Sequence, residues 1–368
     1  MGELVLTQLD FFIIIIYIVL MIFIGVLLKK KSSSSIKQFF IGNRDIPWWL
    51  AGVSMVATTF AADTPLAVTG IVILSGISGN WIWWCFMFSG MMTSIFFSKL
   101  WRRAEVMTDT EIITLRYSSY PAKALRSFRA FYLAIPINCI ILGWVTLGMS
   151  KVIMALTGLE SWKIIIFLYT ITSFYIALSG IWGIVITDFF QFIIAMIGSI
   201  ALMYFAIIDT GSISILKTQL VNQYGPNHFY LDFMPFSNPK IAFSTVFVWL
   251  GFQWWSSWYP GAEPGGGGYV VQRVLSTKSE KDAIKSTLIF NILHYAVRPW
   301  PWIIVALVAL VKYPTLNDPE MGYPLLMRDV LTPGWMGLLI LVFLSAFMST
   351  VSTHLNWGSS YLINDFYK

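Results

Sequence analysis

Long apolar stretches alternate with short polar ones along the whole chain. The first runs from Phe11 to Leu28, eighteen residues without a charge, which is near the lower limit for a helix that crosses a hydrocarbon core about 30 Å thick. Nine such stretches can be delimited, at 9–28, 47–75, 80–100, 127–156, 163–179, 182–208, 241–271, 286–312 and 334–363. The pattern predicts an all-α polytopic membrane protein. No polar stretch is long enough for a soluble domain, so 1–368 is expected to be a single transmembrane domain.

Composition strengthens this prediction. Only 11% of the residues are charged and 57% are hydrophobic, whereas soluble proteins carry about 25% charged residues. A secretory signal peptide is the alternative interpretation of the first stretch. However, Lys29, Lys30 and Lys31 follow the stretch instead of preceding it, which is the reverse of the order in a signal peptide. The first stretch is therefore interpreted as an anchor in the lipid bilayer.

Basic residues gather in alternate loops. The basic loops are 29–44, 102–129 and 273–285, the last beginning with Arg273, and the loops poor in Lys and Arg are 76–79, 157–162, 209–240 and 313–333. With the N-terminus outside, every basic loop is cytoplasmic, as the positive-inside rule requires. The prediction is a multi-pass protein of the plasma membrane whose chain ends on the cytoplasmic side. Topology accounts for the net charge of +6, so no nucleic-acid partner is expected.

Two of the stretches contain residues that break helices. In the second, Pro65 follows a run of small and hydroxyl residues that begins at Ala57, and a proline removes a backbone donor and disturbs the preceding turn. In the seventh, prolines and four consecutive glycines interrupt the run from Trp254 to Gly268. A plain proline kink and a helix that ends in a flexible loop are the alternatives. Two interrupted helices five stretches apart indicate a transporter built from inverted repeats.

Polar side chains inside the membrane mark candidate binding sites. In the ninth stretch, Ser349, Ser352, Thr353 and Asn356 share one helical face. Their oxygens suit a hard monovalent cation, although hydroxyl residues also serve as helix–helix contacts. Asp188 in the sixth stretch needs a cation, a basic side chain or water, and a capping role is the alternative.

The eighth stretch carries the pair His294 and Arg298, one helical turn apart. An arginine at that depth is expected to face the bundle interior and to pair with a carboxylate, for which Asp63 and Glu263 are candidates, or with an anionic ligand. The two cysteines indicate neither a disulfide framework nor a metal site. The sequence shows no HExxH, no GxSxG and no cofactor fingerprint, so an enzyme is not expected.

Six motifs in order resemble the sodium:solute symporter family, which includes sodium/glucose and sodium/proline carriers. They are FFIGNRDIPWWLAGVSMVATTFAADTPLAVTG, NWIWWCFMFSG, WRRAEVMTDTEIITLRYS, GIWGIVITDFFQF, YVVQRVLSTKSEKDA and SAFMSTVSTHLN. The resemblance implies a LeuT-like core of five-plus-five inverted helices preceded by one extra helix at 9–28. Residues 47–208 would be the first repeat and 241–365 part of the second, with core helices 6–8. Because the family continues for two more core helices, the chain is expected to be truncated at its C-terminus.

The resemblance also implies binding residues. A sodium site would use the carbonyls of Ala57, Phe60 and Ala346 with the hydroxyls of Ser349 and Thr350. A second sodium site in some relatives matches Asp188, Ser349, Ser352 and Thr353. The substrate positions correspond to Asp63, Thr64, Asn138, Tyr259, Glu263, His294 and Arg298.

These substrate positions do not reproduce the set of a sugar carrier, and their charges favour a small polar or charged organic solute. The implied function is secondary active symport of that solute with Na⁺, the one cofactor expected, across the cytoplasmic membrane by alternating access. A sensory input module and an inactive transporter fragment are the alternatives.

Overall fold

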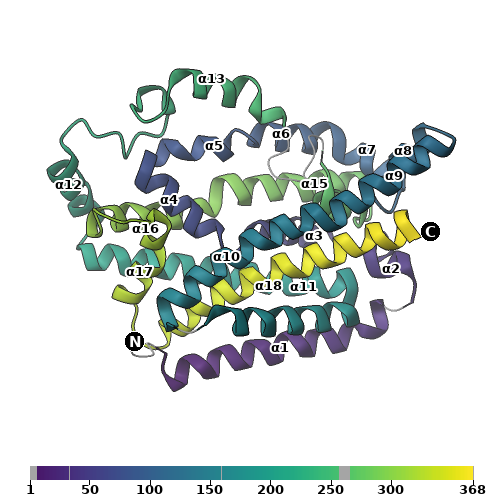
Figure 1. Ribbon diagram of the computed structural model, residues 1–368, viewed down its shortest axis with the longest axis horizontal. Coiled ribbons are helices and arrows are strands. Elements are labelled where there is room, and N and C mark those ends of the chain that lie inside the picture. Colours follow the sequence, from purple (N-terminus) through teal and green to yellow (C-terminus); the bar gives the residue numbers. More distant parts are fainter. Residues whose placement is uncertain (1–5, 33, 159, 257–265, 368) are drawn as a thin grey trace.

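The structure, a computed structural model, describes residues 6–32, 34–158, 160–256 and 266–367. In these ranges the regular elements are helices, and the long ones lie side by side along one direction (Figure 1). Five helices are long and apolar enough to cross a membrane, and as many as seven spans result if each of two bent helix pairs counts as one. The predicted all-α membrane protein is confirmed at this level.

The first predicted break is present. Helix α3 (Trp48–Thr59) and helix α4 (Thr64–Ser75) are bent by 60° relative to each other. Pro65 lies in the first turn of α4, where a missing N–H costs nothing. Phe60 has already left the helical conformation, with φ −86° and ψ 65°. The backbone between Thr59 and Thr64 is therefore not helical, in the middle of an apolar span.

The fifth and sixth predicted stretches form helix α11 (Ser161–Thr210), which is interrupted at Gly180. Gly180 has φ 51° and ψ −153°, a conformation that favours glycine. A Cβ at Gly180 would also lie 2.8 Å from the carbonyl oxygen of Phe39. The chain thus turns between two helical segments, as the two separate apolar stretches predict.

The seventh predicted stretch is also divided. Helix α13 (Phe243–Gly251) is followed by the short turn η6 (Gln253–Trp255), and helix α14 (Gly268–Leu275) begins further on. The predicted substrate residues Tyr259 and Glu263 lie outside the described residues.

The first helix, α1 (Gln8–Ser32), packs against α11 and against helix α18 (Trp335–Tyr361). Its buried Asp10 accepts hydrogen bonds from the backbone N–H groups of Gly334 (2.8 Å) and Gly337 (2.7 Å). These amides begin α18 and have no partner inside the helix, so Asp10 fixes α1 to the start of α18.

The remaining helices complete the bundle. They are α2 (Ile36–Ile41), α5 (Trp81–Trp84), α6 (Met87–Met92), α7 (Ser98–Ala104), α8 (Glu111–Arg116), α9 (Tyr120–Tyr132), α10 (Asn138–Thr157), α12 (Ile213–Tyr224), α15 (Glu280–Asn291), α16 (Pro299–Lys312) and α17 (Gly322–Val330). Figure 1 places α2, α8 and the end of α18 at one end of the bundle, and α12 and α17 at the other. This arrangement separates the basic loops from those poor in Lys and Arg.

Candidate ion and solute site

The break between α3 and α4 meets the hydroxyl face of α18. The Thr350 hydroxyl lies 2.9 Å from the carbonyl oxygen of Thr58, to which it donates, and 3.1 Å from that of Ala346. The hydroxyls of Thr58 and Thr353 are 2.9 Å apart. Segments nearly 300 residues apart in the chain (295 between Thr58 and Thr353) therefore share one buried polar interface.

All five residues predicted for the first sodium site are buried in or beside this interface: Ala57, Phe60, Ala346, Ser349 and Thr350. The amide of Phe60 donates to the carbonyl of Ala57 at 3.1 Å, which closes the end of α3. The Thr350 hydroxyl donates to Thr58, which belongs to the predicted break but was not among the predicted sodium ligands, and the Ser349 hydroxyl donates to Asp188. The predicted set thus lies where α18 meets the break between α3 and α4.

Ser349 bonds to Asp188, the centre of the second predicted sodium site. The Asp188 carboxylate accepts hydrogen bonds from the hydroxyls of Ser349 (2.6 Å) and Ser54 (2.5 Å). Ser352 donates instead to the backbone of its own helix, at the carbonyl of Ser349 (2.8 Å). Ser349 and Asp188 thus contact each other directly, whereas the Ser352 hydroxyl is engaged within α18.

A buried arginine faces the same carboxylate. Arg273 Nη2 lies 3.8 Å from Asp188 Oδ2, and it donates to the hydroxyl of Thr353 at 2.7 Å. Its Nε donates to the hydroxyl of Ser54 at 3.2 Å. The assignment of Arg273 to a cytoplasmic loop was wrong, because α14 continues through it and buries it completely. The sequence feature that could have predicted its burial is its position between apolar residues in YVVQRVL.

A cavity of about 460 Å³ adjoins the interface. Four of the predicted substrate residues line it, namely Asp63, Thr64, His294 and Arg298. Asn138 does not line the cavity, but it holds His354, which does. Its amide donates to the His354 carbonyl at 3.0 Å, and its Oδ1 lies 2.7 Å from His354 Nδ1.

Arg298 projects into the cavity from the turn before α16. Its Nη1 donates to the Thr59 hydroxyl (2.8 Å), its Nε donates to the His294 carbonyl (3.3 Å), and the guanidinium lies over the ring of Trp302. The predicted ion pair with Asp63 is not formed within 4.0 Å, and across the described ranges no other carboxylate comes that close to Arg298. The sequence correctly predicted that Arg298 lies in the interior. Of the two carboxylates proposed as its partner, Asp63 is further away, and Glu263 lies outside the described residues.

Aromatic residues form much of the remaining cavity wall. Trp83 stacks on Tyr295 with ring centroids 6.0 Å apart and meets the His294 ring edge-on at 5.8 Å. The indole of Trp144 and the phenol of Tyr269 also line the space. Trp83 belongs to the NWIWW motif of the family resemblance and was not among the predicted site residues.

A second cavity of about 460 Å³ adjoins the first and shares Ala67, Ile71 and Ile82 with it. It is also lined by Asp318 and Glu320 from the segment that precedes α17. At its edge, Lys151 from α10 lies 2.8 Å from Asp318 and 2.5 Å from Glu320. The central cavity thus continues toward the bundle end that carries α12 and α17.

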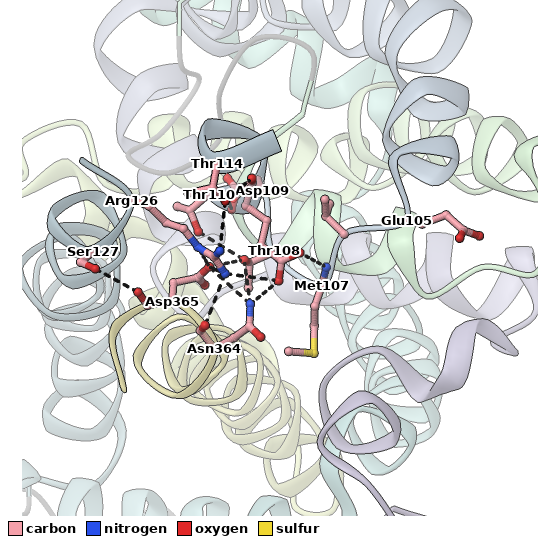
Figure 2. A network of polar contacts seen from close by, with 12 residues as sticks. Glu105, Met107, Thr108, Asp109, Thr110, Thr114, Arg126, Ser127, Asn364 and Asp365 are labelled. Carbon is pink, nitrogen blue, oxygen red and sulfur yellow. Dashed lines mark hydrogen bonds and ion pairs between the residues drawn. The ribbon is translucent and has the colours of Figure 1, made fainter. Parts of the chain in front are cut away.

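At the opposite end, a polar network joins the loop before α8 to η9 (Leu362–Tyr367), the segment that directly follows α18 (Figure 2). Asp365 accepts from Arg126 Nε (2.7 Å) and from the Thr108 hydroxyl (2.9 Å). Asp109 accepts from the Tyr361 hydroxyl and, at 3.4 Å, from the amide that begins α14. Burial raises the pKa of Asp109 above its usual value. The network ties α9, α14 and α18 together.

An apolar helical bundle with a broken span, buried hydroxyls and a central cavity defines a multi-pass membrane protein with the architecture of a carrier. Residues 39–368 match the model of the sodium:solute symporter family, and the chain belongs to that family. The family consists of transporters, so the expectation that the chain is not an enzyme is confirmed.

Individual relatives are distant. The chain is 24% identical to the human sodium-coupled monocarboxylate transporter 2 (90% of this chain, 53% of the relative) and 24% identical to the human sodium/iodide cotransporter (91% and 51%). It is 21% identical to the sodium/glucose cotransporter of Vibrio parahaemolyticus (91% and 63%). The chain spans about half the length of the human relatives.

A solved structure shares the fold. The outward-open, substrate-bound state of a Na⁺-coupled sialic acid symporter superposes with a TM-score of 0.80 at 21% identity, over 98% of this chain and 75% of that one.

Proposed function

We propose that this chain acts in a sodium-coupled carrier that moves a small polar or charged organic solute across the plasma membrane by alternating access. The observation that carries the proposal is the meeting of the α3–α4 break with the hydroxyls of α18, directly beside a cavity that both elements line. An ion bound in such an interface changes the contact between two helices that also hold the solute. The names of the relatives support sodium as the coupling ion.

The sodium ion would lie between the carbonyls of Ala57, Phe60 and Ala346 and the hydroxyls of Ser349 and Thr350. Neutral oxygens replace the hydration shell of Na⁺ without trapping it. Inward movement of sodium releases about 2.3 kcal/mol per charge for each 100 mV of membrane potential, in addition to its concentration gradient. Coupling then requires only that sodium binds better to the conformation that also binds the solute.

At the second predicted sodium position, Arg273 already supplies a positive charge beside Asp188. We propose that Arg273 and a cation compete for the oxygens of Asp188, Ser349 and Thr353. A second sodium would then bind only in a conformation in which the guanidinium has withdrawn, and Ser352 would have to turn away from its own helix.

The proposed layout follows the family resemblance. Helix α1 is the extra helix, 47–208 is the first repeat, and 241–365 belongs to the second. The N-terminus lies outside and the polar network of Figure 2 lies on the cytoplasmic side. The distribution of basic loops supports this orientation.

The test is sodium-dependent thermal stabilisation of the purified chain, which needs no knowledge of the solute. Ser349→Ala and Thr350→Ala each remove one oxygen, a loss of about 1–3 kcal/mol. The sodium concentration for half-maximal stabilisation should rise about tenfold, since 1.4 kcal/mol is a factor of ten.

Ser345→Ala is the matched control, because its buried hydroxyl donates only to Val342 in the same helix, at 2.8 Å. It should leave the sodium response unchanged. An unaltered response in both Ser349→Ala and Thr350→Ala would remove the sodium assignment.

A further inference from the structure

The central cavity is lined by a buried guanidinium whose hydrogen-bond acceptors, among the described residues, are all neutral. Arg298 is 2% exposed. Its hydrogen-bond acceptors are the Thr59 hydroxyl, the carbonyls of Val56 and His294 and the ring of His294. A charge taken out of water is stable when a counter-charge replaces the lost hydration. Among the described residues no carboxylate lies within 4.0 Å of Arg298, so none of them forms a direct ion pair with it.

Asp63 lines the same cavity, and one of its carboxylate oxygens lacks a hydrogen-bond donor among the described residues. Asp63 precedes α4, but its side chain makes no capping hydrogen bond to that helix. Its Oδ1 is buried and has no hydrogen-bond partner among the described residues. An unmade hydrogen bond to a buried carboxylate oxygen is costly, so this oxygen is ready for a donor from within the cavity.

These two side chains line one cavity without forming an ion pair. An uncharged sugar would leave both groups without a charged partner in direct contact. A simple anion would satisfy Arg298 but would place its negative charge near that of Asp63. A solute with a carboxylate and a protonated amine satisfies both and leaves the cavity neutral overall.

We therefore propose that the solute is a small zwitterionic amino acid, with its carboxylate on Arg298 and its ammonium group on Asp63. The inference rests on the proposed transport function and names the substrate class of the same cavity. The aromatic wall formed by Trp83 and Trp144 suits the apolar part of such a solute. Arg298 offers a planar fork of donors that matches a carboxylate, which a lysine does not.

The test measures sodium-driven uptake into proteoliposomes with matched solutes. L-alanine is compared with L-lactate, which lacks the ammonium group, and with alaninamide, which lacks the carboxylate. Larger amino acids and glucose complete the panel. At least one amino acid should compete at least tenfold better than its hydroxy-acid and amide counterparts.

The variants separate the two contacts. Asp63→Asn should weaken amino-acid binding while leaving hydroxy-acid binding equal or stronger. The preference for the amino acid over its hydroxy acid should therefore become smaller or reverse. Arg298→Gln should abolish the preference for any carboxylate, and Arg298→Lys should restore part of it. Arg328→Gln is the control, because this exposed arginine bonds to its neighbour Asp329 outside the cavity. The sodium-dependent melting shift of each variant shows whether it is folded.

The outcomes are distinguishable. Uptake of glucose, or equal competition by lactate and alanine with no effect of Asp63→Asn, overturns the zwitterion assignment and leaves sodium symport standing. A wild-type chain that shows no stabilisation by sodium and no sodium-driven uptake of any solute in the panel contradicts the proposed function itself.

Discussion

Gly148 in α10 lies against the backbone of the α3–α4 break, and a single methyl group there should displace the break. A Cβ at Gly148 would lie 2.6 Å from Asp63 Cα, 2.7 Å from its Cβ and 2.8 Å from its N. Carbon atoms in favourable contact are about 3.5–4.0 Å apart, so Gly148→Ala requires a shift of about 1 Å. Two of the three atoms belong to the backbone and cannot rotate away.

The magnitude follows from a comparison with Gly143 on the same helix. A Cβ at Gly143 meets no atom within 4 Å. Both substitutions gain the same helix propensity, at most about 1 kcal/mol. Only Gly148→Ala adds the cost of overpacking, about 1–3 kcal/mol. The difference in stability between the two variants should therefore equal that cost.

The assay is thermal unfolding of both variants in detergent, with and without sodium and the preferred amino acid. Gly148→Ala should unfold at a lower temperature than Gly143→Ala and bind the solute more weakly, because Asp63 moves with the backbone. Equal stability and equal ligand response in the two variants would refute the reasoning, since it would mean that the break yields to a methyl group at no cost.

Two further predictions concern buried charges. Arg273→Gln should destabilise the fold by about 3–5 kcal/mol because it leaves Asp188 without its positive partner, and the Arg273→Gln/Asp188→Asn double variant should recover part of this loss in a double-mutant cycle measured by unfolding. Because burial raises the pKa of Asp109, the folded chain holds this proton more tightly than the unfolded chain does. Asp109 therefore costs stability as the pH rises from its usual pKa of 3.8 through its folded pKa, and the difference in melting temperature between Asp109→Asn and the wild type should grow in favour of the variant over that window.

The sequence predicted those parts of the fold that depend on short-range properties. The length of an apolar stretch predicts a membrane-spanning helix, and Pro65 predicts where the second span is interrupted. Both predictions depend only on residues of the helix concerned. Gly180 separates two apolar stretches, and its left-handed conformation explains why the chain turns there. The alternation of basic loops is also a local property, because it depends only on which loops between the spans contain Lys and Arg.

The parts of the site that were missed depend on contacts between distant segments. The role of Asn138 is to hold His354, 216 residues away, and nothing near Asn138 indicates that pairing. The position of Arg273 was misjudged because the predicted seventh stretch stopped at residue 271, whereas α14 extends to Leu275. Because the predicted end of this span was a few residues too early, the fully buried Arg273 was predicted to lie in a loop.

The two buried arginines show why the charges of the central cavity point to a ligand. Arg273 and Arg298 are equally hidden from water, at 0% and 2% exposure. Arg273 lies close to the carboxylate of Asp188 and is surrounded by hydroxyls, so the protein itself supplies its counter-charge. Arg298 carries the same desolvation penalty, but its hydrogen-bond acceptors among the described residues are neutral, and it shares its cavity with Asp63 without an ion pair. Arg298 and Asp63 thus face one cavity without touching, and the proposed amino acid would contact both of them, with its carboxylate on Arg298 and its ammonium group on Asp63.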